Sequence, residues 1–257
     1  MKDFTAYILF FSLCVFCGCR NGADKVELLD RRASIEDIKV SDGFVSTTFE
    51  AAGGYVSWLK QTRFDIECIV KVNKPGDGFY LTEYDCQLYP WSNSIVVSAS
   101  EPGGAVQARL VDGRYAETNR AGLAELISAE LNGRYLLGMI LNLYTAPARL
   151  VEGDAVHAAA SGPGEIKGLW HRPLLETSSR SAVVIEGDCR LFYYQDQDTS
   201  LIDMIWFTDL EDEFFMVRGY DYRKLSGSDI LIPAAAEIYI TDDRGVIQRQ
   251  LMRLEVK

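Results

Sequence analysis

The segment from Asn119 to Thr145 constrains the fold more than any other part of the chain. Its apolar residues recur at the three- and four-residue spacing of a helix, and in its second half they spread around the whole circumference. A helix without a polar face must be covered on nearly all sides, so another layer of structure has to enclose it. Asn119 suits the N-cap of this helix, and we expect Pro147 to end it.

On both sides of this helix, apolar and polar side chains alternate with a period of two, which predicts half-buried β-strands. Clusters of glycine, proline and aspartate separate these blocks and predict turns. We expect strands at residues 64–72, 79–89, 94–100, 105–111, 114–117, 183–185, 188–195, 201–208, 214–222, 235–241 and 246–256. Because each turn leads to another strand, the sequence predicts an antiparallel meander interrupted by one helix.

A further helix is predicted at the N-terminal side of the strands, from Gly43 to Gln61. Its apolar residues step by four and three along one face, namely Val45, Phe49, Ala52, Val56 and Leu59. Gly53 and Gly54 interrupt the middle of this helix, where a glycine costs about 1 kcal/mol relative to alanine. The pair therefore either weakens the prediction or marks close packing against a sheet.

The composition limits the class of protein. The chain has 257 residues, of which 48% are hydrophobic, and this suits one sizeable β-rich domain. Its formal net charge of −11 repels phosphate backbones, which argues against nucleic acid as a partner. The same charge argues against docking on an anionic membrane through a basic face.

The first residues predict export. The apolar run from Ala6 to Cys17 has the length of a signal-peptide core and is too short to span a bilayer comfortably. Gly18 and Cys19 at its end match a bacterial lipobox, in which the cysteine is lipidated and becomes the new N-terminus. Ordinary secretion and an uncleaved anchor are the alternatives to a lipoprotein. Arg20 is not the aspartate associated with inner-membrane retention, which favours the outer membrane.

This organisation gives three parts. We expect a lipoprotein signal peptide at residues 1–18, a polar tether at 19–36 and a single domain at 37–257.

Three cysteines remain in the folded part, Cys68, Cys86 and Cys189. Cys68 and Cys86 lie on neighbouring predicted strands, and an oxidising compartment would permit a disulfide between them. If the intervening turn is centred near Pro75-Gly76, however, Cys68 lies opposite about Glu83. Buried free thiols are therefore the alternative.

No catalytic or cofactor motif is found in the sequence, so we expect neither an enzyme nor a bound metal or cofactor. The sequence has no nucleophile elbow, P-loop or dinucleotide fingerprint. His157 and His171 lie in an irregular region without a second metal-type residue at helical spacing. Asp196, Asp198 and Ser200 begin like a calcium loop, but the position that needs glycine is Leu201, so we interpret this stretch as a turn.

Two stretches resemble a known family. They are YDCQLYPWSNSIVVSASEP, in the early meander, and FFMVRGYDYRKLSGSDILIPAAAEIYITDDRGVIQRQLMRLEV, at the C-terminus. The second contains a tyrosine-rich strand around Tyr220 and Tyr222 and a step from Gly227 to Pro233. With the order of signal, helix, meander, apolar helix and closing meander, the chain resembles LolA-type outer-membrane lipoprotein-sorting proteins with the LolA/LolB-like fold.

The resemblance implies an α+β, mostly β fold. It implies a curved antiparallel sheet of about ten strands that forms an incomplete, half-open β-barrel. An N-terminal helix and a central apolar helix would pack on its concave face. Free carriers of this family diffuse across the periplasm, whereas a lipidated Cys19 would hold this chain on a membrane of the cell envelope, facing the periplasm.

The implied function is non-enzymatic binding of lipid, or of the acyl chains of lipoproteins, in a hydrophobic cavity between sheet and helices. Burial of an acyl chain contributes about 0.8 kcal/mol per CH₂, so the site needs an apolar lining and few directional contacts. The candidate lining residues are Leu137, Met139, Ile140, Leu143, Trp170 and Trp206. A packed core requires the same residue types, so core is the alternative for each of them. An envelope protein-interaction or sensor module with a filled core is the alternative function.

Overall fold

The computed structural model describes residues 43–74, 76, 78–101, 104–118, 133–152, 156–157, 180–186, 190–208 and 214–257. The predicted signal peptide, lipidation site Cys19 and tether lie outside these residues, as do Trp170, His171 and Cys189. The first half of the predicted central helix, residues 119–132, also lies outside them.

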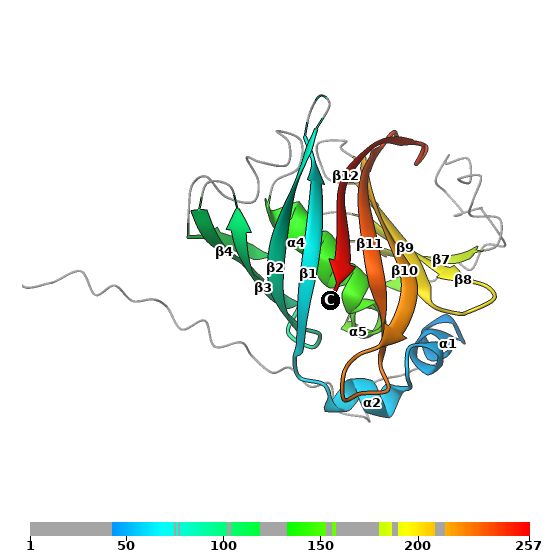
Figure 1. Ribbon diagram of the computed structural model, residues 1–257. Coiled ribbons are helices and arrows are strands. Elements are labelled where there is room, and N and C mark those ends of the chain that lie inside the picture. Colours follow the sequence, from blue (N-terminus) through cyan, green and yellow to red (C-terminus); the bar gives the residue numbers. More distant parts are fainter. Residues whose placement is uncertain are drawn as a thin grey trace, which may run out of the picture.

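In the described part of the chain, twelve antiparallel strands form one curved sheet (Figure 1). The first meander contains β1 (Phe64–Asn73), β2 (Phe79–Tyr89), β3 (Ser94–Glu101), β4 (Gly104–Val111) and β5 (Arg114–Glu117). The second contains β6 (Val156–His157), β7 (Arg180–Glu186), β8 (Arg190–Asp196), β9 (Ile202–Thr208), β10 (Phe214–Lys224), β11 (Leu231–Thr241) and β12 (Ile247–Val256). The predicted strands are thus confirmed, with β6 as an addition.

The two meanders are joined in the middle of the sheet by the strands that come first and last in the sequence, β1 and β12. β1 pairs with β12 from Cys68 opposite Val256 to Val72 opposite Met252. Beyond this pairing, the Asn73 side-chain amide donates a hydrogen bond of 3.1 Å to the Gln250 carbonyl oxygen. In the described strands the sheet runs in the order β5-β4-β3-β2-β1-β12-β11-β10-β9-β8-β7-β6, with β5 and β6 at its edges. The sheet is therefore an open barrel, as predicted.

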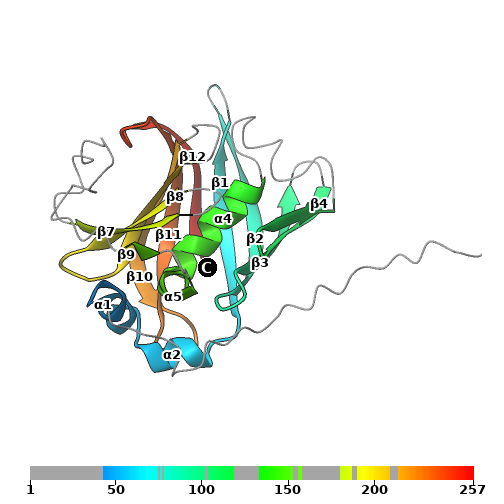
Figure 2. The same cartoon turned by 180° about the vertical axis from the view of Figure 1, so that it is seen from behind.

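Helix α4 (Gly133–Tyr144) lies on the concave side of the sheet (Figure 2). It contacts β3, β4 and β5 of the first meander and β9 and β10 of the second. A helix of Ala146–Glu152, α5, follows directly. Pro147 therefore separates the two helices as expected, but it lies in the first turn of α5, where the missing N–H of proline is tolerated.

The predicted N-terminal helix is two helices, α1 (Gly43–Ala51) and α2 (Tyr55–Lys60), which lie at one end of the barrel (Figure 1). Gly53 and Gly54 break the helix because both adopt positive φ angles, 107° and 84°. A Cβ on Gly53 would lie 2.3 Å from the Asp229 carbonyl oxygen, in the turn between β10 and β11. The glycine pair thus marks close packing as well as the end of α1.

Two details of the predicted strands are corrected by the structure. Cys68 lies opposite Tyr84 and not Glu83, because the β1–β2 connection pairs Asn73 with Phe79 and is one residue longer than a turn centred on Pro75-Gly76. The strand predicted at 235–241 is longer at its start, since β11 begins at Leu231.

The turns are confirmed. At Asp196 the side-chain Oδ1 accepts hydrogen bonds from the Asp198 and Thr199 backbone N–H groups, which makes this stretch an Asx-type turn. At Asp242 the side-chain Oδ1 accepts from the N–H groups of Arg244 and Val246.

Candidate ligand-binding site inside the barrel

Helix α4 is apolar around its circumference and is buried along its length. Only Arg134, near its start, is exposed. The sheet can cover this helix because its two halves approach it from opposite sides. Four of the six predicted lining residues lie here, all buried in the main core, namely Leu137, Met139, Ile140 and Leu143.

Aromatic rings of the second meander face α4. Tyr135 of α4 lies with its ring centroid 6.0 Å from that of Phe207 and 6.2 Å from that of Phe215. Phe207 and Phe215 stack on each other at 5.1 Å across β9 and β10. Neither Phe207 nor Phe215 is among the predicted lining residues, because both lie in apolar runs that do not distinguish the two faces of the sheet.

Trp206 does not lie with the four α4 residues. It belongs to a second buried cluster of β8–β11, which we call the outer cluster: Phe192, Met204, Trp206, Met216 and Tyr239. Trp206 alternates with Ile205 and Phe207, which pack in the main core, so the outer cluster lies on the opposite face of the sheet. Its indole N–H donates a hydrogen bond of 2.8 Å to Thr241 Oγ1.

Polar groups are few on the inner face, and one pair joins α4 to the sheet. The Tyr193 hydroxyl of β8 donates a hydrogen bond of 2.6 Å to Asn142 Oδ1. Asn142 Nδ2 in turn donates a bond of 2.7 Å to the Gly138 carbonyl oxygen, one turn earlier in α4. Both side chains are therefore satisfied inside the barrel.

Tyr144, the last residue of α4, differs from this pair. Its side chain is buried, and its hydroxyl has no hydrogen-bond partner in the described part of the chain. Burial raises the pKa of this hydroxyl well above its ordinary value, and the neighbouring Cys68 and Cys86 add to the effect. An unsatisfied buried hydroxyl costs about 1–3 kcal/mol, so the free protein pays for this arrangement in stability.

Cys68 and Cys86 are free, buried thiols on the inner face of β1 and β2. They are not directly opposite each other, because Cys86 pairs with Ile66 and Cys68 with Tyr84. A hydrogen bond to Cys68, together with burial, raises the pKa of the Cys86 thiol well above its ordinary value. The Cys86 thiol therefore remains protonated, and the two cysteines with Tyr144 form a small polar spot in an apolar interior.

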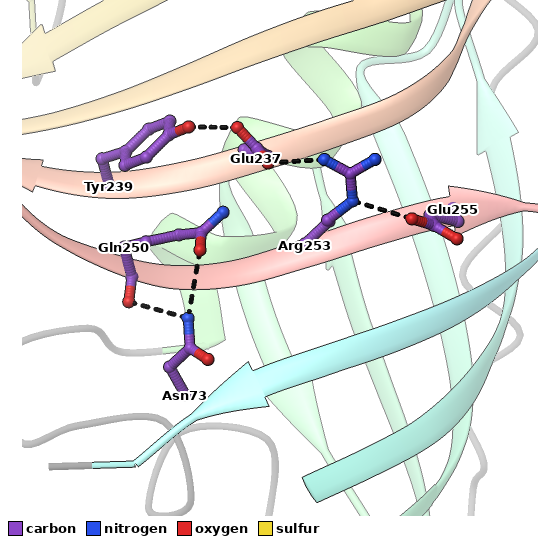
Figure 3. Close-up of polar contacts among 6 residues, drawn as sticks. All are labelled: Asn73, Glu237, Tyr239, Gln250, Arg253 and Glu255. Carbon is purple, nitrogen blue, oxygen red and sulfur yellow. Dashed lines mark hydrogen bonds and ion pairs between the residues drawn. The ribbon is translucent and has the colours of Figure 1, made fainter. Parts of the chain in front are cut away.

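The outer face of β11, β12 and β1 carries a polar network (Figure 3). Glu237 accepts hydrogen bonds from the Tyr239 hydroxyl and, at 2.6 Å, from Arg253 Nη1. Arg253 Nε also donates to Glu255 at 2.8 Å. Burial raises the pKa of the Glu237 carboxyl, but the hydrogen bonds from Tyr239 and Arg253 outweigh it and hold the pKa below its ordinary value. A carboxylate with this many donors holds the strands together and is unsuited to taking up protons.

The described residues contain neither a cluster of metal ligands nor a helix that could span a membrane. Within the described ranges, His, Cys, Asp and Glu side chains form no group of three or more that could hold a metal ion. None of the helices among the described residues is long and apolar enough to cross a membrane.

The fold and its interior define an open antiparallel barrel around an apolar helix. No protein family matches the sequence, and the search of curated proteins finds no match. Among solved structures, the chain is similar to the LolA superfamily protein NE2245 from Nitrosomonas europaea, with 11% identity, 83% of this chain and 90% of that chain covered, and a TM-score of 0.43.

Two other solved structures are similar over the same share of this chain. The putative outer membrane lipoprotein-sorting protein domain from Vibrio parahaemolyticus has 8% identity, with 83% of this chain and 91% of that chain covered and a TM-score of 0.33. In the MucA/MucB complex from Pseudomonas aeruginosa, the matched chain has 10% identity, the same coverages of 83% and 91%, and a TM-score of 0.21. The first of these structures bears the name of the family that the sequence resembles. These similarities concern the fold, and the function depends on the residues of the chain itself.

Proposed function

We propose that this protein is a membrane-anchored, non-enzymatic binder of lipid or of lipoprotein acyl chains. Cys19 is the lipidated anchor, the cell envelope is the location, and the outer membrane is the favoured membrane. The observation that carries the proposal is α4, an apolar helix enclosed by both halves of an open sheet. An acyl chain that moves from water into the apolar contact between α4 and the sheet gains about 0.8 kcal/mol of binding free energy per buried CH₂.

The open sheet supports this proposal. Its edges, β5 and β6, are short strands of four and two residues. A closed barrel has no edges, whereas an open one can widen between its edges. Leu137, Met139, Ile140 and Leu143 are then the lining residues on the helix side, and Met139 is the most adaptable of them.

A photoreactive fatty-acyl probe tests this function. Added to the protein, it should crosslink to residues of α4 (Gly133–Tyr144), and an unlabelled lipopeptide should reduce this crosslinking. Crosslinks confined to the outer face of the sheet, or crosslinks that lipopeptide does not reduce, would contradict the proposal.

A protein-interaction module is the second candidate, and an exposed apolar patch favours it. Ile69, Phe79 and Leu81 lie on the outer face of β1 and β2, and Phe79 and Leu81 are 58% and 62% exposed. Lys71 Nζ lies 4.6 Å above the Phe79 ring. Exposed apolar groups of this kind often mark interaction sites. A photocrosslinker at position 81 should then capture one specific envelope protein, whereas the same group at the exposed Asp112 should not.

A further inference from the structure

Among the described tyrosines, Tyr144 is the fully buried one whose hydroxyl has no hydrogen-bond partner, while the partly buried Tyr55 also has an unpaired hydroxyl. Tyr144 lies at the end of α4, and its hydroxyl is buried beside Cys68 and Cys86 with no hydrogen-bond partner in the described residues. Buried hydroxyl groups are nearly always hydrogen-bonded, so an exception of this kind requires an explanation.

Two other tyrosines in the same core show that the fold can satisfy such groups. Tyr193 donates to Asn142, and Tyr222 donates to the Ile202 carbonyl oxygen. Tyr144 has the same chemistry and comparable burial, but no acceptor. A phenylalanine would fill the same space without the cost of a buried, unsatisfied hydroxyl.

We propose that the Tyr144 hydroxyl is the polar recognition point of the ligand site and donates a hydrogen bond to a neutral carbonyl oxygen of the ligand. The ligand class is then an acyl ester or amide, the form in which fatty acyl groups occur in lipids and lipoproteins. This inference rests on the proposed function. It assigns the residue that binds the carbonyl end of the acyl chain, while the α4 lining would hold the hydrocarbon part.

The surroundings of Tyr144 favour a neutral carbonyl over an ionised carboxylate. After burial, the groups that act most on the Tyr144 hydroxyl are the two thiols, which are weak donors, followed by Tyr222 and Arg223. A carboxylate moved into this interior would lose its hydration, and the one cation that acts on Tyr144, Arg223, has the smallest effect of the groups named, whereas an ester or amide oxygen needs only a single donor. Tyr144 also remains protonated, because burial raises the pKa of its hydroxyl.

The length of α4 fits a single chain. Its 12 residues extend over about 18 Å. The hydrocarbon core of a bilayer is about 30 Å thick, so one acyl chain reaches about 15 Å. With its carbonyl at Tyr144, such a chain runs along Ile140 and Leu137 toward the start of α4 and remains against apolar side chains throughout.

The test compares methyl laurate with tetradecane, a hydrocarbon of the same length that lacks the carbonyl. Both are delivered from cyclodextrin, and binding is measured by displacement of a fluorescent alkyl probe from the protein. The native protein should bind the ester about tenfold more tightly than the alkane. Tyr144→Phe should abolish this preference by weakening ester binding about tenfold, and it should leave alkane binding unchanged.

Tyr193→Phe is the matched control, because it removes a buried phenol hydroxyl that has a partner. It should lower stability but leave the preference for the ester in place. Tyr144→Phe, in contrast, should not lower stability in the absence of ligand, since its hydroxyl makes no bond to lose.

An equal preference for the ester in the native protein and in Tyr144→Phe would overturn this inference while leaving acyl binding intact. Failure of the native protein to bind either probe would overturn the proposed function as well.

Discussion

The Tyr193 hydroxyl and the Asn142 side-chain oxygen lie 2.6 Å apart and join β8 to α4. This bond fixes the rotation of an apolar helix that has little else to orient it, because apolar contacts are not directional. Asn142 also bonds the Gly138 carbonyl oxygen, so the pair links the second meander to the middle of α4.

Tyr193→Phe should therefore destabilise the protein by about 1–2 kcal/mol, because Asn142 is left with a buried, unpaired oxygen. Urea unfolding followed by circular dichroism measures this change. Combined with Asn142→Leu in a double-mutant cycle, the two changes should be less than additive. Strict additivity would show that the bond contributes nothing.

The glycines between α1 and α2 offer a second, paired prediction. Gly53→Ala should destabilise the protein by more than about 2 kcal/mol, because it adds backbone strain and a contact of 2.3 Å with the Asp229 oxygen. Gly54→Ala adds only backbone strain, since no atom lies within 4 Å of the added Cβ. It should lower the free energy of unfolding by about 1 kcal/mol. Thermal unfolding of both variants compares them. Equal losses of stability in the two variants would mean that the packing of Gly53 against the β10–β11 turn does not contribute to stability.

The Glu237 network predicts a pH dependence of stability. Because the folded-state pKa of Glu237 is lowered from its ordinary value of 4.5, its contribution is present above this pH and is lost as the pH falls through the folded pKa. Glu237→Gln should therefore be less stable than the native protein at pH 7, and this deficit should be smaller near pH 3. Urea titrations at both pH values measure this, with the exposed Glu255 changed to glutamine as a control. The same deficit at both pH values would contradict the prediction.

Lipidation at Cys19 remains a prediction from the sequence. Cys19→Ala should abolish the incorporation of radiolabelled palmitate. The variant should also leave the membrane fraction, because the anchor would be lost. Cys17→Ala is the control and should still be labelled. A Cys19→Ala variant that incorporates palmitate to the native level would rule out this site.

Most of the fold could be predicted because the signals were local. Alternation in Phe64–Asn73 and Phe79–Tyr89 gave β1 and β2 nearly to the residue, since each has one buried and one exposed face. The apolar circumference of the central helix likewise predicted its enclosure. The register of Cys68 was wrong by one residue, because register depends on the length of the turn, which the sequence does not fix.

The rest depends on contacts that no local pattern contains. β9 is buried on both faces, so its apolar run could not show that Trp206 faces away from α4. The pairing of Glu237 with Arg253 depends on the strand register and lies beside a bulge at Leu251, where β11 skips from Met252 to Gln250. The Tyr144 hydroxyl lacks a partner because of how the residues around it in the folded protein are arranged, and no local pattern contains that arrangement. Tyrosine itself is a common residue in an apolar helix sequence.

Native mass spectrometry of residues 20–257, which contain all described residues, tests the central claim most directly. The protein should be purified without detergent. We predict a stoichiometric acyl-chain adduct that is retained in Ile69→Glu, on the exposed outer face. It should be lost in a folded Ile140→Phe, whose larger side chain would occupy the volume that the proposed acyl chain needs. An adduct-free native protein that also ignores added fatty acids, methyl esters and lipopeptides would contradict the account.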